Sequence, residues 1–253
     1  MTERTDKRVA VVTGAAQGLG RAFAHRFAAA GAVAVVTDIR EEPAGTVAAE
    51  IEEAGGEALA LPLDVADQHS AERVTGQVLE RFGRLDILVN NASIFSSLKM
   101  RPFDEIPVEE WRRVIDVNLT GVYLCTRAAA QPMKAAGWGR IVNVSSAAVP
   151  MGRPNYLHYV ASKAGVIGLT RGLARELGSW DITVNAILPG ATDTEVERET
   201  VTPEQREALI AMRSIRRAQS TDDLTGVVRF LASDDSAFVT GQSLVVDGGA
   251  VFL

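Results

Sequence analysis

The sequence predicts an α/β fold, a doubly wound parallel sheet of seven strands with helices on both faces. Short runs rich in valine, isoleucine and leucine alternate with longer amphipathic segments along the whole chain. The short runs are almost continuously apolar, which is typical of parallel strands that are buried on both faces. Glycines follow several of the amphipathic segments, as they do where helices end. This alternation indicates right-handed strand–helix–strand crossovers.

Four of the expected strands lie in the first half of the chain. They are predicted at residues 9–13, 33–37, 57–61 and 86–89. The intervening helices are predicted at residues 19–30, 42–54 and 66–82, and the glycines that follow them are Gly31, Gly55, Gly56 and Gly83. The first strand, helix and strand make a β-α-β unit, the building block of a parallel sheet.

Three strands and three helices are predicted in the second half. The strands are expected at residues 140–144, 182–188 and 243–246, and the helices at residues 108–135, 156–177 and 222–232. No linker, repeat or low-complexity tract interrupts the pattern, so residues 1–253 are predicted to form a single domain. The charged segment 193–219, which contains Pro203, is expected to form short helices that close as a lid over a site.

The composition limits the possible classes of function. The formal net charge is −6 and no run concentrates positive charge, which argues against nucleic acid or an anionic membrane as partner and favours a small molecule. The one cysteine, Cys125, lies in an apolar helical stretch and is expected to be buried. The sequence has neither a signal-peptide core nor ~18 uninterrupted apolar residues, so we expect a cytoplasmic protein. Its three histidines form no metal-binding cluster, and no metal is expected.

A glycine-rich turn, Thr-Gly-Ala-Ala-Gln-Gly-Leu-Gly at residues 13–20, joins the first strand to the first helix. Free backbone N–H groups and the helix dipole favour a pyrophosphate at such a turn, and glycine removes the Cβ atom that would obstruct it. A tight turn packed on its neighbours would use the same glycines. The position directly after the first strand favours the nucleotide interpretation.

Asp38 ends the second strand, eighteen residues after Gly20. A carboxylate at this point accepts hydrogen bonds from the adenosine ribose and repels a 2′-phosphate, which predicts NAD rather than NADP. The glycine turn contains no basic side chain that could bind a phosphate. Two other interpretations stay open, because Asp38 could merely cap the following turn and Arg40 could tolerate a phosphate.

Tyr159 and Lys163 are four residues apart on a predicted helix and therefore project from the same face. Ser146 follows the strand at 140–144, so its hydroxyl can meet them at the strand ends. A free phenol has a pKa of about 10, but a neighbouring ammonium group stabilises the phenolate and makes it usable as a base near neutral pH. The three residues can therefore form a proton-transfer device.

Further motifs follow the glycine turn in order along the chain. They are Leu63-Asp64-Val65, Asn90-Asn91-Ala92, Asn118, Pro189-Gly190 with Thr194, Val239-Thr240-Gly241-Gln242 and Asp247-Gly248-Gly249. With the glycine spacing Gly-x-x-x-Gly-x-Gly and the Tyr-x-x-x-Lys pair, they resemble the short-chain dehydrogenase/reductase family over residues 13–249. One departure is Ser93, where relatives usually have glycine. The resemblance implies a Rossmann-type sheet, oxidoreductase activity and assembly as a homotetramer.

The resemblance also implies which residues contact the cofactor NAD. The expected contacts are Gly14, Gln17, Gly18, Leu19, Gly20, Asp38, Ile39, Asp64, Val65, Asn91, Ala92, Tyr159, Lys163, Pro189, Gly190, Thr192 and Thr194. The two threonines are expected near the nicotinamide carboxamide or the phosphates. Capping of its own loop is the alternative for Thr192.

The resemblance implies a catalytic set of Asn118, Ser146, Tyr159 and Lys163. Tyr159 would exchange the proton of the alcohol oxygen while NAD carries the hydride, and Ser146 would hold the same oxygen. Lys163 would bind the nicotinamide ribose and lower the pKa of Tyr159, and Asn118 would anchor a water chain. The family's offset of thirteen residues to the tyrosine selects Ser146 rather than Ser145.

Two neighbours of Tyr159 are less suited to its role. Tyr156 lacks a lysine four residues further on and is expected to line the substrate entrance. His158 lies about 100° around the helix from Tyr159, so a surface or packing role is expected.

The residues predicted to contact the substrate are mostly apolar. They are Ile94, Phe95, Ser146, Val149, Met151, Tyr156 and Met212. This set predicts an uncharged hydrophobic or aromatic pair of secondary alcohol and ketone. Arg153 near the mouth leaves open an acyl-carrier or carboxylate substrate, as in a 3-oxoacyl thioester reductase. A non-catalytic NAD-binding regulator is an alternative of another class, which the complete set of proton-transfer residues argues against.

Overall fold

A seven-stranded parallel sheet forms the centre of the molecule. A computed structural model describes residues 7–196 and 203–253 of the chain. The strands are hydrogen-bonded in the order β3-β2-β1-β4-β5-β6-β7, and neighbouring strands are parallel. Their bounds are β1 Val9–Thr13, β2 Val33–Asp38, β3 Glu57–Pro62, β4 Ile87–Asn90, β5 Gly139–Val144, β6 Ile182–Pro189 and β7 Ser243–Val246. The predicted doubly wound α/β fold is confirmed.

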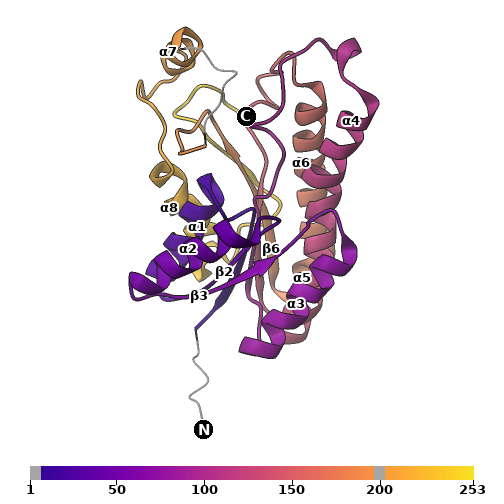
Figure 1. The fold of residues 1–253 in the computed structure, drawn as a ribbon, viewed down its shortest axis with the longest axis vertical. Helices are drawn as coiled ribbons and strands as arrows, with labels where there is room; N and C mark the ends of the chain where they lie inside the picture. The colour runs from indigo at the N-terminus through magenta and orange to yellow at the C-terminus, as the bar shows by residue number, and fades with distance from the viewer. Residues whose placement is uncertain (1–6, 197–202) are drawn as a thin grey trace.

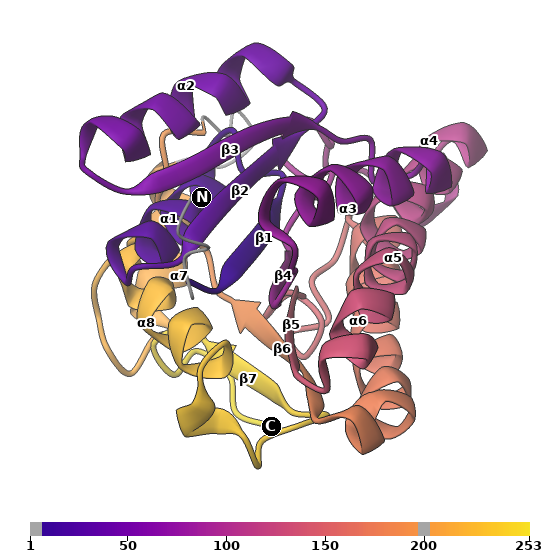
Figure 2. The ribbon, with the colours of Figure 1, turned by 90° about the horizontal axis from the view of Figure 1, so that it is seen from below.

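Helices cover both faces of the sheet, as Figure 1 and Figure 2 show. One face carries α1 Gly18–Ala29, α2 Glu41–Glu53 and α8 Asp222–Leu231, and the other carries α3 Gln68–Phe82, α5 Gly121–Ala136 and α6 Leu157–Leu177. The remaining helical segments are α4 Val108–Ile115, α7 Pro203–Ala211, η1 Phe103–Glu105, η2 Asp116–Thr120, η3 Gly178–Trp180 and η4 Asp234–Ser236. With one exception, the bounds of the predicted elements differ from these by at most two residues.

Successive residues of each strand face opposite sides of the sheet, so the strands contribute to two cores. In β1, Ala10 and Val12 pack with Phe23 of α1 in the first core. Val9 and Val11 belong to the second core, which lies under α3, α5 and α6. Burial on both faces is the reason that the strands have nearly continuous apolar sequences.

The order of the strands reverses beside β1. The chain runs outward from β1 to β2 and β3 and then returns to β4 on the other side of β1. The loops that leave the carboxyl ends of β1 and β4 therefore turn to opposite faces of the sheet. The crevice between such loops is where open α/β sheets bind ligands.

The helix predicted at 108–135 is not continuous, which is the exception noted above. α4 and α5 are joined by η2, a wider turn of the π-helical type. This turn carries Asn118, whose side chain bonds to the backbone of Ile94 and to Ser162. Turns of this type occur frequently at functional sites. The apolar periodicity of the sequence does not reveal this turn. Long-range hydrogen bonds of Asn118 stabilise the irregular backbone, and such bonds leave no local sequence pattern.

The predicted lid at 193–219 is described in part. Its described residues include α7, while residues 197–202 lie outside the described ranges. Within the described ranges, none of the helices combines the length and apolarity needed to cross a membrane. The same residues contain no cluster of three or more histidine, cysteine or acidic side chains that could hold a metal ion.

Candidate active site

The turn after β1 brings backbone atoms unusually close together. A Cβ atom at Gly20 would lie 2.3 Å from the carbonyl oxygen of Gly14, and a Cβ atom at Gly14 would lie 2.7 Å from the Cα atom of Ala92. Gly14 and Gly18 have φ angles of +63° and +59°, which favour glycine. Only glycines allow this turn, which directs the N-terminus of α1 toward the crevice.

Hydrogen bonds join this turn to the one after β4. The hydroxyl oxygen of Thr13 accepts from the N–H groups of Asn91 and Ala92, both at 3.0 Å. The side-chain nitrogen of Asn91 donates to the carbonyl groups of Thr13 and Gly14, also at 3.0 Å. The two loops beside the strand reversal are therefore held as one rigid edge, which reduces the entropy lost when a ligand binds.

Asp38 stands at the end of β2 and is 7% exposed. One carboxylate oxygen accepts from the N–H group of Ala16 at 3.2 Å, and the other accepts from the N–H group of Arg40 at 3.0 Å. The Nε atom of Arg40 lies 3.3 Å from the second oxygen. Asp38 thus caps the turn after β2 and also lines the cavity. Its oxygens keep further lone pairs that can accept from a ligand hydroxyl.

Lys163 is buried beside the end of β5. Its Nζ atom donates to the carbonyl oxygen of Val144 at 2.7 Å and lies 5.8 Å from the centre of the Tyr159 ring. Burial lowers the pKa of Lys163 to about 7, because desolvation disfavours the ammonium form. The hydroxyl of Ser145 donates to the backbone carbonyl of Lys163 at 2.8 Å. These two bonds hold α6 against the end of β5.

Ser146 and Tyr159 line the same cavity as Lys163. Ser146 is half-buried, and its hydroxyl oxygen accepts from the N–H group of Ala148 at 3.1 Å. The hydroxyl proton can therefore be donated elsewhere. Ser145 is buried and bonded to the α6 backbone, so Ser146 is the better placed of the two serines to meet a ligand.

Asn118 lies behind the cavity and is fully buried. Its side-chain oxygen accepts from the N–H group of Ile94 at 2.7 Å, and its nitrogen donates to the carbonyl of Ile94 at 3.1 Å and to Ser162 at 3.3 Å. The next residue, Phe95, contacts the ring of Tyr159 with centroids 4.4 Å apart. Asn118 therefore positions the loop that covers Tyr159.

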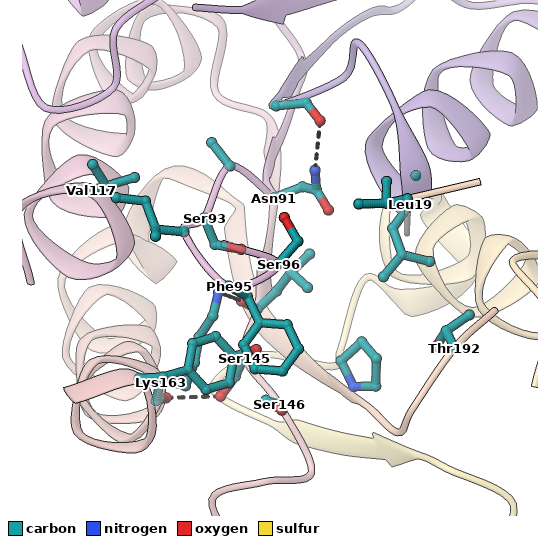
Figure 3. Close-up of a pocket in the computed structure, with 18 of the residues that line it drawn as sticks. Leu19, Asn91, Ser93, Phe95, Ser96, Val117, Ser145, Ser146, Lys163 and Thr192 are labelled. Carbon is teal, nitrogen blue, oxygen red and sulfur yellow. Dashed lines mark hydrogen bonds between the residues drawn. The ribbon is translucent and has the colours of Figure 1, made fainter. Parts of the chain in front are cut away.

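The cavity between these groups measures about 390 Å³. Figure 3 shows Leu19 and Thr192 on one side, Ser146 and Lys163 on the other, and Phe95 between them. The predicted site residues that line it are Gly14, Gln17, Gly18, Leu19, Asp38, Ile39, Asp64, Val65, Asn91, Ala92, Ile94, Phe95, Ser146, Met151, Tyr159, Lys163, Pro189, Gly190, Thr192 and Thr194. Thr192 also donates to the carbonyl of Gly190 at 3.1 Å and so caps its own loop.

Comparison with known proteins identifies the family. A family model described as enoyl-(acyl carrier protein) reductase matches residues 14–251. A 3-oxoacyl-[acyl-carrier-protein] reductase from Synechocystis is 40% identical over 96% of this chain and 97% of its own length. A cis-4-hydroxycyclohexanecarboxylate dehydrogenase from Sinomonas cyclohexanicum is 42% identical over 98% of both chains. The solved structure of a levodione reductase is 34% identical with a TM-score of 0.90 and 96% coverage of each chain. The chain belongs to the short-chain dehydrogenase/reductase family.

As a short-chain dehydrogenase/reductase the protein is an oxidoreductase, and the family uses NAD or NADP. The residues of the cavity fit such a dinucleotide. Gly14 and Gly20 allow the turn to pack closely on itself and on Ala92, and Gly18 is the first residue of α1, so its N–H group lies at the helix N-terminus where a diphosphate would bind. Asp38 provides carboxylate oxygens at the end of β2 for ribose hydroxyls.

Five predicted site residues of this short-chain dehydrogenase/reductase lie outside the cavity wall, namely Gly20, Asn118, Val149, Tyr156 and Met212. Gly20 and Asn118 support wall residues from behind through the contacts described above. Gly20 does so by its close approach to Gly14, and Asn118 by its bonds to Ile94.

Val149, Tyr156 and Met212 were predicted to contact substrate, but the structure places all three outside the cavity wall. The N–H group of Val149 bonds to the carbonyl of Ser146 at 3.2 Å, which turns the chain so that other residues of this segment face the cavity. Tyr156 is 1% exposed and packs on Phe95. Met212 is 57% exposed just beyond α7, and the residue that reaches the cavity from that helix is Leu209.

The wall also contains residues outside the predicted contact sets, among them Arg153 and Arg40, for which the sequence left open a carboxylate or a phosphate ligand. They are Arg40, Leu63, Ser93, Ser96, Arg113, Val117, Val144, Ser145, Ala147, Ala148, Arg153, Ala191, Val196 and Leu209. Several of them adjoin predicted residues in the sequence, and that proximity is the one signal that could have found them. His158 is fully buried with its Nε2 atom 3.2 Å from Glu110, in agreement with a packing role.

Proposed function

We propose that this protein is an NAD-preferring dehydrogenase that interconverts a secondary alcohol and a ketone. The observation that carries the proposal is the grouping of Ser146, Tyr159 and Lys163 around one cavity that extends to the glycine turn and Asp38. When bound, a nicotinamide dinucleotide accepts or supplies the hydride, and the protein has to move the proton.

Tyr159 is the residue that we propose moves the proton. In alcohol oxidation its phenolate oxygen takes the hydroxyl proton, and in ketone reduction its phenol donates that proton to the developing alkoxide. Ser146 donates a hydrogen bond to the same substrate oxygen. Its oxygen already accepts from Ala148, so its proton is directed elsewhere.

Lys163 makes this proton transfer possible near neutral pH. Because burial lowers its pKa to about 7, the ammonium and amine forms are both present at that pH. The ammonium form, 5.8 Å from the centre of the Tyr159 ring, stabilises the phenolate. The active form that we propose therefore has a charged lysine beside Tyr159.

Asp38 supports the preference for NAD. A carboxylate that is 7% exposed at the cavity edge would repel the 2′-phosphate of NADP and accept hydrogen bonds from unmodified ribose. Arg40 on the same rim could attract that phosphate, but its Nε atom lies 3.3 Å from Asp38, which offsets its charge.

The substrate that we propose has an apolar body. Ile94, Phe95 and Met151 contribute apolar surface to the wall near Tyr159. The relative from Sinomonas, by its name, oxidises a hydroxyl group on a cyclohexane ring. A cyclic or aromatic secondary alcohol fits both observations.

The function is tested by following NADH formation with a panel of aryl, cyclic and alkyl secondary alcohols. We expect turnover with at least one cyclic or aromatic alcohol and a higher kcat/KM with NAD than with NADP. Tight NAD binding without turnover of any alcohol or ketone would contradict the proposal and favour a regulator.

A second candidate is reduction of a 3-oxoacyl thioester, which the relative from Synechocystis favours. Arg153 on the cavity wall could face the anionic groups of a carrier. The discriminating assay compares a 3-oxoacyl thioester with cyclic ketones, each with NADH and NADPH. A clear preference for the thioester would select this second function.

We further propose a homotetramer that works in the cytoplasm. Large apolar side chains are exposed on the α4, α5 and α6 side and near the chain end, namely Val108, Tyr123, Leu157, Phe252 and Leu253. Contact with further copies would remove them from water. The buried thiol of Cys125 suits a reducing compartment. Light scattering should give four times the 27.0 kDa chain mass, and a monomer would contradict the tetramer.

A further inference from the structure

Arg153 is a cavity-wall arginine for which the described residues provide no carboxylate partner. It lines the main cavity and also an adjoining cavity of about 280 Å³. The other arginines of the adjoining cavity are engaged, because Arg206 pairs with Asp193 and Arg213 donates to two backbone carbonyls. The guanidinium N–H groups of Arg153 are therefore available to a ligand.

A series of ring contacts connects Arg153 to Tyr159. The guanidinium carbon lies 5.2 Å from the centre of the Tyr156 ring. That ring is 5.5 Å from Phe95, and Phe95 is 4.4 Å from Tyr159. Tyr156 is buried, so the series holds the arginine on the side of the cavity where Phe95 and the proton-transfer tyrosine lie.

We propose that Arg153 binds a carboxylate of the substrate, which makes the preferred substrate a hydroxy acid or oxo acid with an apolar body. The proposal rests on the proposed function, since it names the substrate class of the same site. A planar guanidinium can bind a carboxylate through two parallel hydrogen bonds, which fixes orientation as well as charge. The cation–π contact with Tyr156 leaves the edge of the guanidinium free to make such bonds. Arg153 is thus a specificity-determining residue.

The test uses 3-hydroxy-3-phenylpropanoate and its methyl ester, which lacks the negative charge and carries one additional methyl group. In the Arg153→Gln variant we expect kcat/KM for the acid to fall about 10- to 100-fold, with little change for the ester. Arg153→Lys should restore part of the loss. The control is Arg216→Gln, which makes the same charge change at an exposed arginine outside both cavity walls and should leave the preference intact.

A binding measurement separates the possible outcomes. Calorimetry with 3-phenylpropanoate, which cannot be oxidised, should show weaker binding to Arg153→Gln in the presence of NADH. Equal losses for acid and ester, or preference for a 3-oxoacyl thioester, would overturn the role of Arg153. Absence of NAD-dependent turnover with either substrate in the wild type would instead count against the proposed function.

A different contact, at the glycine turn, carries a second inference. The carboxylate of Glu195 accepts from the N–H group of Gly18 at 2.9 Å. Gly18 is the first residue of α1, whose N-cap residue Gln17 makes no side-chain cap. Arg21 lies 3.9 Å from Glu195 but is paired more closely with Glu50, at 2.8 Å. The acidic side chain therefore occupies the anion position of the glycine turn.

Glu195 can leave this position without disturbing either core. Its side chain is 51% exposed, and it belongs to the segment between β6 and α7. Its neighbours Thr194 and Val196 lie on the cavity wall and are joined by a 3.2 Å bond from the Val196 N–H group to the Thr194 hydroxyl.

We infer that Glu195 competes with the diphosphate of the dinucleotide for the Gly18 N–H group and thereby weakens dinucleotide binding. Two anions cannot share one donor at the helix N-terminus without repelling each other. Binding therefore requires displacement of Glu195, and its return to Gly18 favours release.

The test is equilibrium binding to Glu195→Gln, which keeps the shape of the side chain and removes its charge. We expect NADH and ADP-ribose to bind about 3- to 10-fold more tightly, with slower release in stopped flow, and adenosine to bind unchanged because it has no diphosphate. The control is Glu207→Gln, an exposed carboxylate of α7 outside both cavity walls. Unchanged or weaker ADP-ribose binding, or an equal gain for adenosine, would overturn the inference. Failure of the wild type to bind ADP-ribose would instead count against the cofactor site.

Discussion

The side chain of Asn118 bonds to both backbone polar groups of Ile94, at 2.7 Å and 3.1 Å. This double contact joins the wide turn η2 to the loop after β4. Because Phe95 follows in that loop and contacts Tyr159, Asn118 supports the surroundings of Tyr159 from outside the cavity wall.

Replacement of Asn118 by alanine should destabilise the protein and loosen this loop. It leaves both polar groups of Ile94 without their described partner, which should lower the free energy of unfolding by about 1–3 kcal/mol. Urea denaturation measures the loss. Ser162→Ala removes the 3.3 Å contact with Asn118 and the 2.8 Å bond from the Ser162 hydroxyl to the Tyr159 carbonyl, but it keeps both bonds to Ile94 and should cost less. Equal stability of Asn118→Ala and wild type would contradict the positioning role.

Gly20→Ala should destabilise the glycine turn, because the added Cβ atom would meet the Gly14 carbonyl oxygen at 2.3 Å. We expect a loss of about 1–3 kcal/mol in unfolding free energy together with weaker ADP-ribose binding. Gly45→Ala is the matched control, since nothing lies within 4 Å of its Cβ position in α2. That control should gain about 1 kcal/mol from helix propensity. Similar changes in unfolding free energy for Gly20→Ala and Gly45→Ala would contradict the close approach of Gly20 to the Gly14 carbonyl.

Much of the fold can be predicted from sequence for a physical reason. Strands such as β1 and β6 are buried on both faces, so their apolar runs are unambiguous. Helices end at glycines with positive φ such as Gly83 and Gly137, which are visible in the sequence. The wide turn at Asn118 is invisible, because long-range hydrogen bonds rather than local periodicity select it.

In the candidate site, too, some positions can be predicted from the sequence and others cannot. Residues at strand ends and at i, i+4 on one helix, such as Asp38 and the Tyr159–Lys163 pair, have positions that topology determines, and all of them line the cavity. The positions of loop residues are not determined by the topology of the sheet. Tyr156 and Met212 were expected at the substrate, yet one is packed beneath Phe95 and the other faces solvent. Glu195 belongs to no recognisable sequence motif, and only its contact with the Gly18 N–H group shows that it lies at the glycine turn.

The lowered pKa of Lys163 predicts a pH dependence of stability. Its folded-state pKa is about 7 and its ordinary value is 10.5, so between these values the unfolded chain binds more protons at this residue than the folded chain. The free energy of unfolding should therefore rise with pH in this window, by at most ~1.4 kcal/mol per pH unit. Lys163→Met should lack this component. Urea denaturation of both proteins at pH 7 and pH 9 measures the difference, and parallel pH profiles would contradict the burial effect.

Asp38→Ala should reduce discrimination between the two dinucleotides. Without the carboxylate, the repulsion of a 2′-phosphate disappears and Arg40 is released from its 3.3 Å contact. We expect kcat/KM with NADP to rise and that with NAD to fall, each by about tenfold, or ~1.4 kcal/mol. Equal use of NAD and NADP by the wild type would show that Asp38 does not select the cofactor.

Tyr159→Phe tests the central claim most directly, because it removes one oxygen atom and keeps the ring that contacts Phe95. The measurement is kcat/KM for the best alcohol, with the Kd of NADH determined on the same preparation. We predict a loss of at least about 10²-fold in kcat/KM with the Kd of NADH changed less than about twofold. A variant that binds NADH normally and retains its activity would contradict the role of Tyr159 in proton transfer.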